Sequence, residues 1–267
     1  MARRTLRVAT ALLSTVGLTP LAAQRPASAP TYFATVMTPV GALPPLAMPA
    51  QLGAPRFGVG LDLVYGYGRL SAEQHLPLHT AGAQVELALL GGMLSVSGNG
   101  AYLIPDCGVA LHCDAFPMVG ATAALRISRW AVADPSRSGF VTLALHAEGG
   151  LGFPKGGRAR AAAAGPSVTF VGTHGTSGTL RVIGFVTPQA VWGRLRVSDP
   201  AEFDQQFGSP LAPGDTTLEK EGVRFLIGGG LAVVNTRVGV GLHFGIQHVV
   251  VHGARPRVGV SVSWRSP

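Results

Sequence analysis

Two stretches near the C-terminal end of the chain alternate between apolar residues and polar residues or glycine. In residues 236–247 one parity consists of Val238, Val240, Leu242, Phe244 and Ile246. After a break at 252–256 the alternation resumes with Val258, Val260, Val262 and Trp264. A period of two is that of a β-strand with one apolar face. Because the opposite face carries glycine, serine, histidine and arginine, the apolar face is suited to lipid, which predicts a transmembrane β-barrel.

The composition supports a membrane barrel over a cytosolic enzyme. Only 13% of the 267 residues are charged, 37 are glycine, and the mean hydropathy is positive. Beyond the N-terminus, no apolar run reaches the ~20 residues that a membrane helix needs. Low charge without a helical span is typical of chains that cross a membrane as strands.

The N-terminus has the pattern of a cleavable export signal. Arg3, Arg4 and Arg7 precede an apolar stretch at 8–18, and small residues before position 24 offer a cleavage site. We therefore expect a signal peptide at 1–23, with a competing site at 27–29. Loss of the three arginines lowers the formal net charge from +8 to +5. Export argues against a nucleic-acid partner, and the remaining charge suits anionic lipid headgroups.

The rest of the chain divides into a lead-in and a barrel. Residues 24–55 are rich in proline and alanine and predict an irregular periplasmic segment, and 56–265 form the barrel domain. Ten segments show strand patterning, which predicts an all-β, antiparallel, up-and-down barrel. They are 56–69, 80–90, 93–103, 117–130, 139–151, 166–173, 180–197, 221–234, 236–250 and 257–264. Merging a pair within 160–197 gives the eight-stranded alternative, and Pro188 predicts a bulge there.

The connections sort into two sets, as in bacterial barrels with short inner turns and long outer loops. The inner turns fall at 91–92, 132–138, 174–179 and 235–236. The outer loops fall at 70–79, 104–116, 152–165, 198–220 and 251–255. Aromatic residues that would form interfacial girdles lie near both ends: Phe57, Phe140 and Trp264 at the inner end, and Tyr65, Tyr67, Tyr102 and Phe153 at the outer end. Closure would pair the last strand with the first.

A signal, alternating strands and a near-terminal aromatic together resemble the small bacterial outer-membrane β-barrel superfamily over about residues 56–265. The resemblance implies the outer membrane of a Gram-negative cell, with membrane lipids and lipopolysaccharide as surroundings and a monomeric state. It also implies recognition by the barrel-assembly machinery through the terminal strand, whose apolar residues are Val258, Val260, Val262 and Trp264. The chain departs from the pattern because three residues follow Trp264.

The two cysteines, Cys107 and Cys113, lie six residues apart in a predicted outer loop. In an exported protein such a pair predicts a disulfide. The alternative is a metal site with His112, Asp106 and Asp114, which would be sparse in ligands. We expect no metal and no cofactor.

Parity places several charged residues in the lumen, where unpaired charges would cost much free energy. We predict a lumen charge network of Asp62, Glu86, Arg126, His146, Glu148, Arg224 and His243, with Gln84, Asn99 and Gln247 also inward. His146 and Glu148 are two residues apart and so share a face. No His-x-Ser motif like that of the lipid A deacylase barrels is present, so we expect no catalytic residues.

The function predicted from these patterns is a structural or passive small-solute pore role in the outer membrane. One alternative is an outer-membrane hydrolase that modifies lipids. The other is a soluble periplasmic barrel that binds an apolar ligand, in which the aliphatic parity would face inward.

Two outer loops differ in charge. Lys155, Arg158 and Arg160 in loop 152–165 could contact lipid phosphates. Loop 198–220 is acidic and lacks the spacing of a calcium loop, so a solvated loop is favoured over a cation-binding or adhesive one. Its acids are Asp199, Glu202, Asp204, Asp215 and Glu219.

Overall fold

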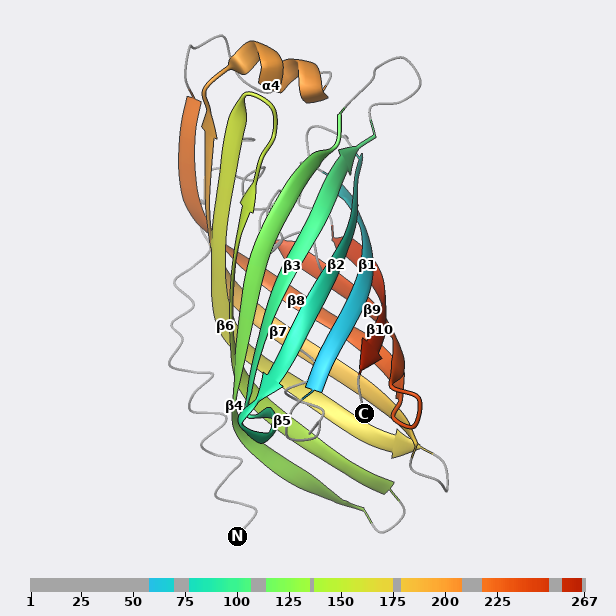
Figure 1. The fold of residues 1–267 in the computed structure, drawn as a ribbon. Coiled ribbons are helices and arrows are strands. Elements are labelled where there is room, and N and C mark those ends of the chain that lie inside the picture. The colour runs from blue at the N-terminus through green and yellow to red at the C-terminus, as the bar shows by residue number, and fades with distance from the viewer. Residues whose placement is uncertain are drawn as a thin grey trace.

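The computed structural model describes residues 58–69, 77–106, 114–134, 137–174, 179–207, 218–249 and 256–265. Over these residues, ten antiparallel strands close into a barrel in which each strand pairs with its neighbour in sequence and β1 pairs with β10 (Figure 1). The strands are β1 (Gly58–Arg69), β2 (Pro77–Leu89), β3 (Leu94–Pro105), β4 (Phe116–Asp134), β5 (Arg137–Gly152), β6 (Gly157–His174), β7 (Leu180–Val197), β8 (Leu218–Asn235), β9 (Val240–Val249) and β10 (Arg257–Arg265). A 3-10 turn, η1 (Leu90–Gly92), joins β2 to β3, and a helix, α4 (Pro200–Phe207), follows β7. The prediction of ten strands is confirmed.

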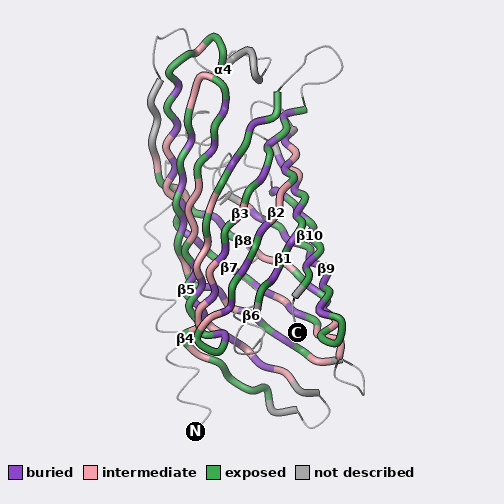
Figure 2. Tube along the Cα trace, in the orientation of Figure 1, coloured by how far each residue is buried: buried purple, intermediate pink, exposed green. Residues whose placement is uncertain are grey.

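The apolar parity faces outward on every side of the barrel. Buried and exposed residues alternate along the strands (Figure 2). Leu63, Leu231 and Leu242 are 60%, 61% and 62% exposed, which is far more than a soluble core residue would show. A continuous belt of exposed aliphatic and aromatic side chains is the surface that lipid covers. Within the described ranges, no helix is long and apolar enough to cross a membrane.

The closing contact has the predicted partners. Leu61 pairs with Trp264 and Tyr67 with Val258, so the two ends of the barrel domain lie side by side. The strands meet the short turns at one end of the barrel and the longer connections at the other. At the β8–β9 turn the Asn235 Oδ1 accepts hydrogen bonds from the backbone N–H of Arg237 and Val238, at 3.0 and 3.4 Å. Because of this turn, β9 begins at Val240, four residues later than the pattern predicts.

The third outer connection is much shorter than predicted. Residues 157–165 continue β6 instead of forming a loop, and they pair with the outer end of β7. The remaining turn at 153–156 uses Gly156 at φ +64°, and a Cβ there would lie 2.2 Å from the Asp199 carbonyl oxygen. The turn is therefore packed closely against the start of the connection that carries α4.

The predicted bulge at Pro188 is wrong. The β7–β8 register runs unbroken through Pro188, and the β6–β7 pairs on either side of it keep the same register. The Pro188 carbonyl oxygen fits against Gly165, where a Cβ would lie only 1.9 Å away. A glycine on the neighbouring strand thus accommodates the proline without an extra residue.

A register shift occurs instead between Arg126 and Ser128, where β4 pairs with β5. It exchanges the two faces of β4, so Trp130 points outward and Arg129 stacks over the ring of Phe140 at 3.8 Å. Phe140 is buried inside the barrel. The expectation that Phe140 belongs to the inner aromatic girdle is therefore wrong, and Trp130 is exposed near that end of the barrel.

Candidate functional site: the lumen and an outward arginine cluster

The interior of the barrel contains both polar and apolar buried side chains. The apolar cluster at the end with the short turns is Phe140, Val171, Ile183, Phe185, Ala232 and Val234. Fully buried apolar side chains also lie near the outer loops: Leu78, Leu103, Phe116, Met118, Leu195 and Phe203.

One polar group in the middle joins three strands. The Gln189 Nε2 donates to the His146 Nδ1 and to the Glu148 Oε1, both at 2.8 Å. Next to it, the hydroxyls of Ser167 and Thr187 lie 3.0 Å apart. Because one amide nitrogen carries two hydrogens, Gln189 can serve both acceptors at once. The arrangement ties β5 to β7 across β6 and holds His146 with its Nδ1 as the acceptor.

A second group lies near the inner end of the last strands. The His243 Nε2 and the Ser263 Oγ are 2.7 Å apart, and Asp62 is the cross-strand partner of Ser263. A Cβ at Gly241 would lie 2.6 Å from the Ser263 Oγ, so the glycine makes room for this contact. A serine nucleophile needs an approach for the substrate carbonyl, yet Ser263 and His243 are only 2% and 3% exposed. The pair links β9 to β10 in the buried interior.

The residues of the predicted charge network all lie on inward-facing positions. Asp62, Glu86, His146 and His243 are buried, and Arg126, Glu148 and Arg224 are half-buried. Through Gln189 the structure brings His146 and Glu148 together. The Arg224 Nη1 donates to the carbonyl of Val223 at 2.7 Å. A mutual ion pairing of all seven remains a prediction.

Sequence reasoning missed Gln189, and of the four arginines described next it named Arg158 and Arg160 but missed Arg194 and Arg196. Gln189 follows a proline, in a region where the apolar pattern does not show which face is inward. The available signal was its spacing: Gln189 lies two residues after Thr187 and two before Val191, and all three are buried on the same face of β7.

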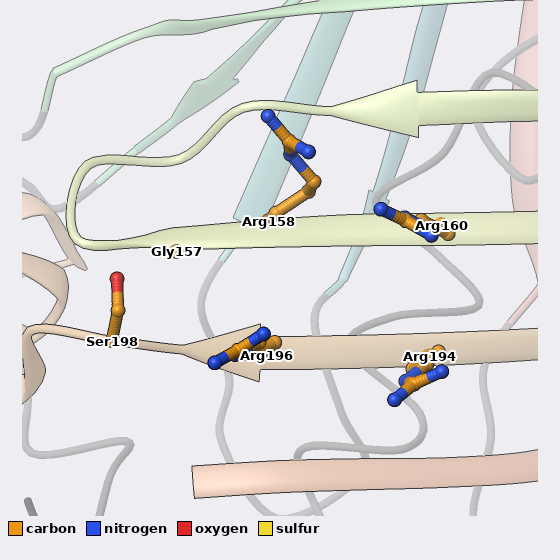
Figure 3. Close-up of a pocket in the computed structure, with 6 residues that line it drawn as sticks. All are labelled: Gly157, Arg158, Arg160, Arg194, Arg196 and Ser198. Carbon is orange, nitrogen blue, oxygen red and sulfur yellow. The ribbon is translucent and has the colours of Figure 1, made fainter. Parts of the chain in front are cut away.

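Four arginines gather on the outward face of β6 and β7, at the outer end where β6, β7 and β8 extend together. Arg158 is the cross-strand partner of Arg196, and Arg160 that of Arg194. Together with Gly157 and Ser198 they line an open hollow of about 400 Å³ (Figure 3). Arg158 and Arg160 are therefore strand residues and not members of a loop. Lys155, in the turn, pairs with Asp114, and this hydrogen bond raises the pKa of Lys155.

The predicted disulfide between Cys107 and Cys113 lies outside the described residues, as do the signal peptide and residues 24–55. Of the alternative metal ligands, Asp114 pairs with Lys155, and Asp106 lies 3.9 Å from the His79 Nε2. Among the described residues, no group of three or more His, Cys, Asp and Glu side chains is placed to hold a metal ion.

No protein-family model and no curated protein sequence matches the chain. Among solved structures it is similar to the outer-membrane enzyme PagL, at 10% identity and a TM-score of 0.32, covering 77% of this chain and 99% of that one. It is also similar to Ail, the attachment invasion locus protein of Yersinia pestis, at 7% identity and a TM-score of 0.29, covering 80% and 100%. A third is a mutant of the monoaromatic hydrocarbon channel TodX, at 10% identity and a TM-score of 0.25, covering 81% and 69%.

These structures are outer-membrane β-barrels, and they include an enzyme, an attachment protein and a channel. At such low identities and TM-scores they select no role for this chain. The architecture itself, a closed antiparallel barrel with an apolar exterior, rests on the strand pairing and the burial described above.

Proposed function

We propose that this protein is a monomeric outer-membrane β-barrel with a structural role, whose lumen is packed with side chains and does not conduct solutes. The observation that carries the proposal is the burial of the lumen. Asp62, Glu86 and Gln84, all polar and all on lumen-facing positions, are 0%, 1% and 3% exposed.

An open pore would leave such polar side chains in contact with water. Here the carboxylates of Asp62 and Glu86 are shielded from water. The interior of a barrel of about eight strands is just wide enough for side chains to fill it, and ten strands add only a little width. Packing of the lumen therefore favours the structural role over the passive pore.

Localisation in the outer membrane is supported by the export signal pattern, the apolar exterior and the terminal strand that ends at Trp264. The exterior carries 50% exposed Trp264 and Phe244 and 62% exposed Leu242, a surface that would aggregate in water. The soluble ligand-binding alternative requires these side chains to face inward. In the structure they face outward.

Fractionation of bacteria that express the full chain tests localisation. We expect the protein in the outer-membrane fraction, with an electrophoretic mobility that changes on heating as folded barrels unfold. Recovery as a soluble periplasmic protein would refute the proposal.

Conductance across a planar lipid bilayer tests the packed lumen. We expect the folded protein to give no stepwise current. Defined, reproducible current steps would assign the passive pore instead. Release of fatty acid from lipid A or phospholipid by the same folded preparation would assign the hydrolase.

A further inference from the structure

The outward arginine cluster, Arg158, Arg160, Arg194 and Arg196, lies directly beyond the apolar belt. On β8 the exposed apolar residues run from Val233 to Val223. Val223 pairs with Trp192 of β7, and Trp192 pairs with Ala162 of β6. Arg194 and Arg160 are the next outward residues on their strands.

The height of this belt equals that of a bilayer. Ten residues at about 3.3 Å each, tilted by about 40°, rise about 25 Å along the membrane normal, which is the height of the apolar band of outer-membrane barrels. Arg194 and Arg196 are two and four residues past Trp192, and so about 5 and 10 Å beyond the apolar boundary. Trp192 itself occupies the interfacial position that aromatic residues favour. The arginines therefore lie at the level of lipid headgroups.

The charges of this cluster repel one another. Like charges on directly opposed positions destabilise a sheet, and here two such pairs are adjacent, Arg158 with Arg196 and Arg160 with Arg194. On the next strand, the register places Glu219 opposite Arg196 and Glu221 opposite Arg194. Four arginines and two glutamates at these register positions give the cluster a formal charge of +2 by sequence.

The hollow gives an anion a place to bind. Guanidinium groups match phosphate oxygens with two parallel hydrogen bonds and hold phosphate well in a lipid interface. The guanidinium carbon of Arg158 lies 5.7 Å from the centroid of the Phe153 ring. Phe153 directly follows β5, so an aromatic ring lies next to this arginine. Ser198 adds a hydroxyl at the rim. A phosphorylated lipid has anionic phosphates above apolar acyl chains, and it would meet cations and an aromatic ring above an apolar wall at this site.

We propose that the outward arginine cluster binds the phosphate groups of lipopolysaccharide in the outer leaflet, with the acyl chains lying along the belt below Trp192. The inference rests on the proposed placement in the outer membrane and adds a lipid site to it. The bound lipid would offset the repulsion among the arginines and would anchor the β6–β7 extension at the membrane surface.

Binding to the folded, full chain in detergent micelles tests the proposal, with native mass spectrometry as the readout. The probes are lipid A with two phosphates, the same lipid without phosphate, and inorganic phosphate alone. We expect retention of the phosphorylated lipid and a loss of more than about tenfold in affinity for the dephosphorylated one, because losing even one charge-assisted hydrogen bond weakens binding about tenfold. Inorganic phosphate that binds as tightly as the lipid would overturn the lipid as its source.

Variants separate a lipid site from a structural patch. Arg194→Gln should weaken binding of phosphorylated lipid A about tenfold, and Arg160→Gln serves if the first variant does not fold. Arg237→Gln removes the same charge at the opposite end of the barrel and should leave binding unchanged. Glu221→Gln should strengthen binding. A cluster that only forms salt bridges would instead lose heat resistance in Glu221→Gln, with lipid binding equal in all variants, and that outcome would overturn the inference.

The two proposals fail separately. Binding is measured on purified protein, so a soluble cellular location would remove the proposed function while the binding result remained readable. Outer-membrane localisation combined with arginine-independent binding would remove the lipid site alone.

Discussion

An arginine introduced at the middle of the exposed belt should destabilise the barrel far more than the same arginine at its edge. Ile227 and Val223 are suited to this comparison because both point outward on β8, at 49% and 57% exposure, and differ by four residues. The substitutions are Ile227→Arg and Val223→Arg. Composition, strand and face are thus matched, and only depth differs.

The magnitude follows from the position of each residue along the belt. The belt on β8 runs from Val223 to Val233, so its midpoint is at 228. At about 2.5 Å of rise per residue, Ile227 lies within ~3 Å of the membrane midplane, and Val223 lies about 13 Å from it. An arginine on the lipid face costs about 2–4 kcal/mol at the midplane and about 0–1 kcal/mol near the interface. We expect the free energy of unfolding to differ by roughly 2–3 kcal/mol between the two variants.

Equilibrium unfolding by urea in lipid vesicles, followed by tryptophan fluorescence, measures this difference. The folded fraction is checked by the heat-dependent shift in electrophoretic mobility. If the outward face met water, both substitutions would act as surface changes of about 0.5 kcal/mol or less. Equal effects at the two positions would therefore refute the lipid-facing assignment of the belt.

Three further predictions use the same unfolding assay. Gly165→Ala should lower the free energy of unfolding by about 1–3 kcal/mol, because the new Cβ would lie 1.9 Å from the Pro188 carbonyl oxygen. Gly98→Ala is the control and should be neutral, because nothing lies within 4 Å of its Cβ position. Equal effects of the two substitutions would contradict this. Gln189→Leu should cost about 1–3 kcal/mol, because it strips a histidine and a carboxylate of their shared donor, and an unchanged midpoint would show that this contact contributes nothing. Phe140→Ala should cost about 3–5 kcal/mol by opening a cavity in the inner apolar layer, and a loss below about 1 kcal/mol would mean that the layer is loosely packed.

The strand number, the closure and the outward direction of the apolar face could all be predicted from the sequence. In the C-terminal strands every second residue is aliphatic or aromatic, and a shift by one residue would turn that whole set toward the lumen. Such segments specify register strongly. The pairing of Val258 with Tyr67 and of Trp264 with Leu61 follows from this patterning and from closure.

Where small residues occupy both faces of a strand, the sequence pattern does not show which face points outward. Residues 161–164 are four consecutive alanines, so neither parity is more apolar than the other, and the strand in 157–165 was predicted as a loop. The exchange of faces at Arg126 was missed for a related reason. A bulge inserts one extra residue, and in the sequence this residue looks like another polar position of the alternating pattern. Only the strand register, in which Trp130 pairs with Val141, reveals it.

The residue at which β6 begins determines whether Arg158 and Arg160 lie in a loop or on a strand. In a loop, Arg158 and Arg160 would be separate, hydrated charges with no fixed distance to any other cation. As strand residues they are held opposite Arg196 and Arg194, one strand spacing of about 4.8 Å away. Cations held at that spacing repel one another, so extending a strand by nine residues turns separate basic loop residues into a fixed cluster, and this cluster is the basis of the proposed phosphate site. The same change holds the cluster at a fixed distance beyond Trp192 along the strands, and this fixed position makes the proposed lipid site testable by single substitutions.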